Sequence, residues 1–250
     1  MVEKRKEKLR EKFCQLIYPK GIYCVLCGSV IDGTRKYELC DNCIEKFLWI
    51  TNNNCQKCGK ILVQDYIGDF CPDCLEREHY FDRGFTCATY SLYERNLILE
   101  YKKRDKSYIG RILGEILYDR IVIENLSVDV IIEVPIHFKK LKSRGYNQAE
   151  IMTRDLAQRL GLPYKPRVIK RKRETVSMKK LGVWERIANM TDAFEVEKRN
   201  VNWVKGKNVL LVDDIYTTGA TVDMCSKALK DAGAETVYVL TFASGGMMVR

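Results

Sequence analysis

Two adjacent carboxylates and a run of threonine and glycine lie close together near the end of the chain. Residues 209–221 read VLLVDDIYTTGAT, an apolar stretch followed by Asp213, Asp214 and a Thr/Gly segment. Carboxylates accept hydrogen bonds from vicinal ribose hydroxyls and hold magnesium directly or through water. Hydroxyls and free N–H groups at the start of a helix bind phosphate, and the helix dipole assists them. The alternative is an ordinary strand-to-helix turn with capping residues. The phosphate-binding residues would be Thr217, Thr218, Gly219, Ala220 and Thr221.

A basic segment follows an earlier apolar stretch. Residues 134–149 read VPIHFKKLKSRGYNQA, and within them Arg144 with Gly145 is the best-placed pair for a pyrophosphate group. A solvated basic loop explains this segment equally well when it is considered alone. His137, in the same segment, is expected to be a hydrogen-bonded structural residue rather than an acid or a base.

Eight of the eleven cysteines form a repeat that is typical of metal binding. The spacing C-x2-C-x12-C-x2-C occurs twice, thirty-one positions apart, and its members are Cys24, Cys27, Cys40 and Cys43, then Cys55, Cys58, Cys71 and Cys74. Eight thiolates complete two tetrahedral zinc shells and leave no ligand position for substrate, so both sites are predicted to be structural. Iron–sulfur ligation suits this spacing less well. Small buried apolar cysteines would require the doubled spacing to be accidental.

The cysteine spacing alone allows two pairings. Each half of the repeat can bind one metal, or the halves can interleave in a cross-brace, and we favour one metal per half. Cys14, Cys87 and Cys225 stand outside the repeat and are expected to be buried as small apolar side chains.

Alternating strand and helix patterns must position the charged segments. We expect strands over 128–134, 208–212 and 236–242, and helices over 147–160 and 220–232, the last one closed by Gly233. This order predicts an α/β fold with a mainly parallel sheet and helices on both faces. Ligands bind such sheets at the carboxyl ends of the strands, where both charged segments fall.

The chain is long enough for one large core and a small additional module. With 43 Lys plus Arg against 33 Asp plus Glu, its net charge of +10 favours polyanionic partners. No apolar run reaches the ~18 residues of a membrane span, and residues 1–12 lack the apolar core of a signal peptide, so we expect a cytoplasmic protein without a transmembrane segment. Residues 1–20 predict a basic amphipathic helix, which packs on the main domain or docks peripherally on a membrane.

The segment VLLVDDIYTTGAT resembles the fingerprint with which type I phosphoribosyltransferases bind 5-phosphoribosyl pyrophosphate (PRPP). The whole chain resembles the ComF family of competence-associated proteins, which join an N-terminal zinc-binding region to a phosphoribosyltransferase-like domain. The resemblance includes Lys102 and the VPIHFKKLKSRGYNQAE segment, and Met178 departs from the glutamine usual at that position. It implies three parts: a helix over 1–20, a double zinc ribbon over 21–80 and a type I phosphoribosyltransferase-like domain over 81–250.

What the resemblance implies about function is a competence protein that handles incoming single-stranded DNA in natural transformation. The PRPP site would use Asp213 and Asp214 for ribose and magnesium, residues 217–221 for the 5′-phosphate, and Lys102, Arg144 and Gly145 for the pyrophosphate. A helicase-like competence partner at the inner face of the cytoplasmic membrane is also implied. The alternative is a magnesium-dependent phosphoribosyltransferase of nucleotide salvage, and because no residue identifies an acceptor base, catalysis is left open.

A basic run offers a candidate nucleic-acid surface. Its central residues are Lys170, Arg171, Lys172 and Arg173, with the aromatic side chains of Tyr164 and Trp184 nearby for base stacking. A solvated loop is the alternative.

Overall fold

The structure, a computed structural model, describes residues 21–172 and 193–246. The chain divides into two compact units, Met1–Lys46 and Phe47–Arg250, and each is described by itself. The helix predicted over residues 1–20 lies outside the described residues, as do Cys14, Arg173, Met178 and Trp184. The three-part division expected from the sequence remains a prediction.

The two halves of the cysteine repeat fold alike. An antiparallel bridge joins Tyr23 to Val30 in the first half and Asn54 to Ile61, thirty-one positions later, in the second. Gly28 and Gly59 follow the CxxC pairs with φ of 74° and 75°, a left-handed conformation that glycine adopts without steric cost. The first half contains η1 (Lys36–Glu38) and α2 (Asp41–Ile44), and the second contains α3 (Pro72–Glu76). The sequence repeat is therefore also a structural repeat.

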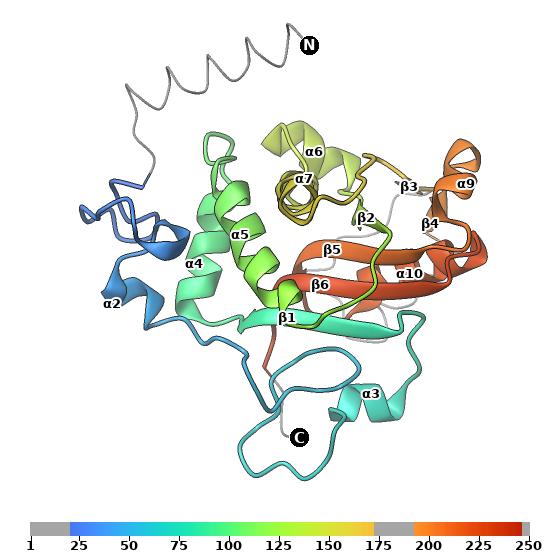
Figure 1. Cartoon of the computed structure of the whole chain (residues 1–250), viewed down its shortest axis with the longest axis horizontal. Coiled ribbons are helices and arrows are strands. Elements are labelled where there is room, and N and C mark those ends of the chain that lie inside the picture. The colour runs from blue at the N-terminus through green and yellow to red at the C-terminus, as the bar shows by residue number, and fades with distance from the viewer. Residues whose placement is uncertain (1–20, 173–192, 247–250) are drawn as a thin grey trace, which may run out of the picture. The chain divides into compact units, whose positions relative to one another are not determined.

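A parallel four-stranded sheet forms the centre of the second unit (Figure 1). Its strands, in the spatial order β1-β6-β5-β2, are β1 (Arg83–Thr89), β6 (Thr236–Ser244), β5 (Asn208–Tyr216) and β2 (Val130–Glu133). The apolar residues 209–212 of β5 are all fully buried. Such continuous apolar runs are typical of parallel strands that are covered on both faces.

Helices cover both faces of this sheet, as the sequence predicts. Helices α5 (Ile109–Val122) and α7 (Gln148–Leu160) pack together on one face, and α10 (Ala220–Asp231) packs on the other. The two-stranded sheet of β3 (Ile169–Arg171) and β4 (Phe194–Val196) packs against α10. The remaining elements are α4 (Leu92–Tyr101), α6 (Phe138–Arg144), η3 (Lys198–Asn200) and α9 (Val201–Val204).

The structure refines two expectations about the charged segments. Strand β5 does not end at Val212 but continues to Tyr216, because Asp213, Ile215 and Tyr216 still pair with β6. The basic segment after β2 is not a loop, since seven of its residues form α6. The predicted helix over 147–160 is confirmed, and the Asn147 side chain caps it by accepting the N–H of Ala149.

The second cysteine cluster shares the core beneath α10. Cys55, Cys58 and Cys71 are at most 2 % exposed and belong to the same hydrophobic cluster as Phe81 and Val209. Cys87 and Cys225 are buried as expected. Among the described helices, none combines the length and apolar character that a bilayer crossing needs.

Candidate functional site

Each half of the cysteine repeat gathers its four sulfur atoms into one cluster. The ligand atoms of Cys24, Cys27, Cys40 and Cys43 lie within 4.8 Å of one another, and so do those of Cys55, Cys58, Cys71 and Cys74. Zn–S bonds of about 2.3 Å in a tetrahedron separate sulfurs by roughly 3.8 Å. The Sγ atoms of Cys27 and Cys40 are 3.7 Å apart, and those of Cys58 and Cys71 are 3.6 Å apart. Both clusters fit zinc, and the prediction of one metal per half is confirmed.

The two clusters differ in their surroundings. In the first cluster Cys27 is exposed and Cys40 is half-buried. In the second cluster, the Cys71 N–H donates to Cys55 Sγ at 3.2 Å, and only Cys74 is not fully buried. A ligand set with no open position and this burial makes the second site a structural centre.

The two acids lie at the carboxyl end of β5, where Lys102 reaches them. Lys102 caps α4 and places its Nζ 3.0 Å from Asp214 Oδ2, with both side chains less than a quarter exposed. Burial alone would raise the pKa of Asp214, but the charges of Lys102, Arg144 and Lys140 outweigh it and lower the pKa. Burial and the neighbouring Asp214 raise the pKa of Asp213 to about 8. At neutral pH the acid pair therefore carries about one negative charge.

The basic residues approach the acids from α6. Arg144, in its last turn, donates to Gln148 Oε1 at 2.7 Å, and Gly145 ends the helix with φ of 84°. Lys102, Arg144 and Asp214 are far apart in the sequence, and the fold brings their charges together at one edge of the sheet. His137 caps α6, since its Nδ1 accepts the N–H of Lys139 at 3.1 Å. This agrees with the structural role expected of it.

The segment of residues 217–221, which the sequence predicts to bind a phosphate and which is here called the phosphate loop, opens α10. Gly219 is its N-cap, with φ of 76°, and the backbone runs so close to Tyr216 that an added Cβ would lie 2.3 Å from the tyrosine hydroxyl. The side chain of Thr217 is exposed, and the Thr218 hydroxyl lies 3.5 Å from the N–H of Ala220. Only glycine fits position 219 without strain.

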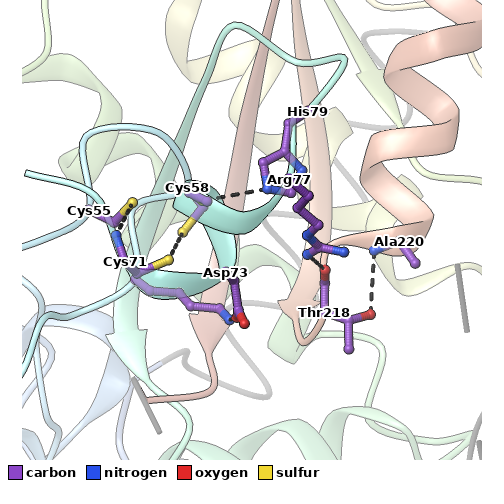
Figure 2. A network of polar contacts seen from close by, with 10 residues as sticks. Cys55, Cys58, Cys71, Asp73, Arg77, His79, Thr218 and Ala220 are labelled. Atoms are coloured by element: carbon purple, nitrogen blue, oxygen red, sulfur yellow. Dashed lines mark hydrogen bonds and ion pairs between the residues drawn. The ribbon is translucent and has the colours of Figure 1, made fainter. Parts of the chain in front are cut away.

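The phosphate loop is also held from outside, by residues that sequence reasoning missed. The Arg77 guanidinium donates to the carbonyl oxygen of Thr218 (Figure 2). The Tyr80 N–H donates to Asp223 Oδ1 at 2.7 Å. Arg77 and Thr218 are 141 positions apart in the sequence. No spacing or motif links them, so the contact could be found only in the folded chain.

The candidate nucleic-acid residues on β3 are partly neutralised. Lys170 and Lys172 lie 2.9 and 3.3 Å from the two carboxylate oxygens of Glu195 on the neighbouring strand β4. The Arg171 guanidinium stands over the Phe194 ring, 5.4 Å from its centroid, and Arg173 lies outside the described residues. The run is less positive than its sequence indicates.

Known proteins match both parts of the chain. A family model described as double zinc ribbon domain matches residues 13–75, and one described as phosphoribosyl transferase domain matches residues 143–247. Competence protein F of Haemophilus influenzae is 30 % identical over 224 residues, which are 86 % of this chain and 94 % of that protein. The chain belongs to the ComF family. The DNA utilization protein YhgH of Salmonella typhi is 28 % identical, over 74 % of this chain and 81 % of its own length.

The two family models and the sheet topology agree on the architecture. This ComF protein combines two zinc-binding sites of four cysteines each with a phosphoribosyltransferase-like parallel sheet. Among solved structures, a glutamine PRPP amidotransferase from B. subtilis aligns with a TM-score of 0.37 at 20 % identity, covering 53 % of this chain and 25 % of that one.

Proposed function

We propose that the carboxyl edge of the sheet binds PRPP with magnesium. The phosphate loop would hold the 5′-phosphate, Asp213 and Asp214 the ribose hydroxyls and magnesium, and Lys102, Arg144 and Gly145 the pyrophosphate. Magnesium, when bound with PRPP, would neutralise the charge on the pyrophosphate. The protein would contribute charge and position, and the proposal names no protein nucleophile.

The observation that carries this proposal is the ion pair between Lys102 and Asp214 at 3.0 Å. It joins the end of α4 to the end of β5. In the proposed site, magnesium and the pyrophosphate group would bind at this same place. A divalent cation at Asp214 would displace the lysine ammonium, which could then meet a pyrophosphate oxygen. The pair thus keeps both groups charged in the free protein, so that metal and anion can bind together.

We propose that the biological role is the handling of single-stranded DNA during natural transformation, in line with competence protein F. Helix α6 is a stronger candidate DNA surface than β3. Lys139 and Lys142 are exposed on α6, and the ring-bearing Phe138 beside them is 71 % exposed. Basic side chains with an exposed aromatic ring suit a strand of phosphates and unstacked bases. Beside the bases of β3, the Phe194 ring is buried.

The PRPP proposal is tested by calorimetric titration with PRPP and magnesium. The double substitution Asp213→Asn with Asp214→Asn should abolish binding, whereas Asp231→Asn, on the exposed end of α10, should leave it unchanged. Unchanged affinity in the double variant would refute the site assignment. Release of pyrophosphate that depends on an added nucleobase would identify a salvage transferase instead of a binding site alone.

The DNA proposal is tested by fluorescence anisotropy on a short single-stranded oligonucleotide at several salt concentrations. Each phosphate contact that is lost should reduce the slope of log K against log salt by about 0.7. Lys139→Glu with Lys142→Glu should lower both affinity and slope more than Lys170→Glu with Lys172→Glu. Absent or salt-insensitive binding would count against the role, and a larger effect on β3 would move the surface there.

A further inference from the structure

Residues 77–80, here called the connector, lie between α3 and β1 along the chain and link the second cysteine cluster to the phosphate loop through side-chain and backbone contacts. The connector follows α3, which begins directly after Cys71 and contains Cys74. Its Arg77 side chain binds the Thr218 carbonyl oxygen, and its Tyr80 N–H binds Asp223 in the first turns of α10. The first contact, which Figure 2 shows, therefore holds the loop itself, and the second holds the helix that the loop opens.

His79, in the middle of the connector, lies between a metal ligand and α10. Its side chain is fully enclosed and stacks on the Phe81 ring at 4.7 Å. Its Nε2 is 3.5 Å from Cys74 Sγ, and its Nδ1 is 3.4 Å from Asp223 Oδ1. A zinc-bound cysteine sulfur is a thiolate, which accepts an N–H from groups around the metal site. The imidazole therefore fills the space between the cluster and the helix.

A third link between the second cysteine cluster and the phosphate loop passes through Lys60 and Tyr216. Lys60, only 5 % exposed, pairs with Asp73 at 2.8 Å and places its ammonium 5.4 Å from the centre of the Tyr216 ring. The Tyr216 hydroxyl lies directly under Gly219. Lys60 and Asp73 each follow a cysteine of the second cluster by two positions, so both lie next to the metal ligands along the chain.

From these three links we propose that the second zinc centre positions the phosphate loop. Zinc at Cys55, Cys58, Cys71 and Cys74 and a phosphate group at residues 217–221 then stabilise each other. Zinc holds α3 and the connector in place, and the connector holds the loop in its binding conformation. Because coupling of two binding events is reciprocal, a phosphate ligand must also raise the affinity of this site for zinc. The ligand half of the inference rests on the proposed PRPP function, whereas the positioning half does not.

The first test measures the loop itself, by amide hydrogen exchange of the zinc-loaded full chain. Arg77→Met removes the donor to the Thr218 carbonyl and should speed exchange in residues 217–221 roughly tenfold, the effect of one lost charge-assisted hydrogen bond. Arg83→Met is the matched control, because Arg83 binds Gln56 and Glu124 and does not contact the loop among the described residues. Unchanged exchange in a folded Arg77→Met protein would overturn the inference. If that variant does not fold, Arg77→Lys replaces it, with a smaller increase expected.

The second test uses the unaltered protein and titrates its zinc at equilibrium against a colorimetric chelator. PRPP with magnesium should raise the zinc affinity of the second cluster several-fold and leave that of the first cluster unchanged. Cys27→Ser, which disables the first cluster, identifies the two transitions. If calorimetry shows that PRPP binds and the zinc affinity of the second cluster is unaffected, the coupling is refuted. If PRPP does not bind but Arg77→Met still loosens the loop, the PRPP function fails and the positioning role is supported.

Discussion

Gly219→Ala tests whether the phosphate loop is as tightly constrained as its geometry indicates. The new methyl group meets two obstacles. The backbone has φ of 76°, and the Cβ would lie 2.3 Å from the Tyr216 hydroxyl and 2.5 Å from its ring carbon. Tyr216 cannot easily move away, because it is 2 % exposed, lies beneath the Lys60 ammonium and meets the Phe81 ring edge-on at 6.3 Å.

The expected cost follows from these two obstacles. A left-handed conformation costs a residue with a Cβ about 1–2 kcal/mol. Overpacking against a buried side chain adds about 1–3 kcal/mol. Gly161→Ala is the matched control, because Gly161 has φ of 67° and nothing within 4 Å of an added Cβ. Gly219→Ala should therefore lower the free energy of unfolding by about 1–3 kcal/mol more than Gly161→Ala does.

The assay is urea unfolding followed by tryptophan fluorescence. All three tryptophans lie in residues 47–250, so the signal reports the unit that contains the sheet. Gly219→Ala should also weaken PRPP binding, and Gly161→Ala should not, because Gly161 ends α7 away from the loop. Equal destabilisation by the two substitutions would refute the close contact between Gly219 and Tyr216.

Three further predictions concern charge and metal. Lys102→Met should weaken binding of PRPP by about tenfold or more in calorimetry, because it removes a pyrophosphate contact, and unchanged affinity would exclude the lysine from the site. Burial raises the pKa of Glu133 to about 6, so its proton is held more tightly in the folded state and stability falls as pH rises from about 4.5 through 6. Glu133→Gln should remove this fall in the free energy of unfolding, which is worth about 2 kcal/mol and can be measured from urea midpoints across this pH range. A variant whose stability falls with pH as the unaltered protein's does would contradict the prediction. A chelator should remove zinc in two phases, and the faster phase should come from the cluster that contains the exposed Cys27. If the unaltered protein shows only one phase and Cys27→Ser shows none, the buried cluster holds no zinc.

Sequence patterns predicted the zinc sites and three of the four strands of the parallel sheet, but they missed β1 and α5. The cysteine repeat worked because zinc ligands must meet at fixed distances, and the short connections between CxxC pairs leave few ways to do so. The helix over 147–160 was predicted to within one residue, because Asn147 caps it and Gly161 ends it with φ of 67°. The end of β5 was missed by four residues, since pairing with β6 extends the strand through two acids that seldom favour strands.

The sequence by itself determined the residue types at the candidate site: two acids, a threonine–glycine loop and the base Arg144 as local patterns, and Lys102 through the family resemblance. Local patterns can be recognised in a short segment because the residue types that do the chemistry lie close together along the chain. Only the tertiary structure decided which charges meet. It brings Lys102 to Asp214, sets Lys170 opposite Glu195 in the β3–β4 pair, and carries Arg77 to the Thr218 carbonyl. Such contacts depend on strand register and on packing between distant segments. The spacing of residues along the chain does not reveal either of these.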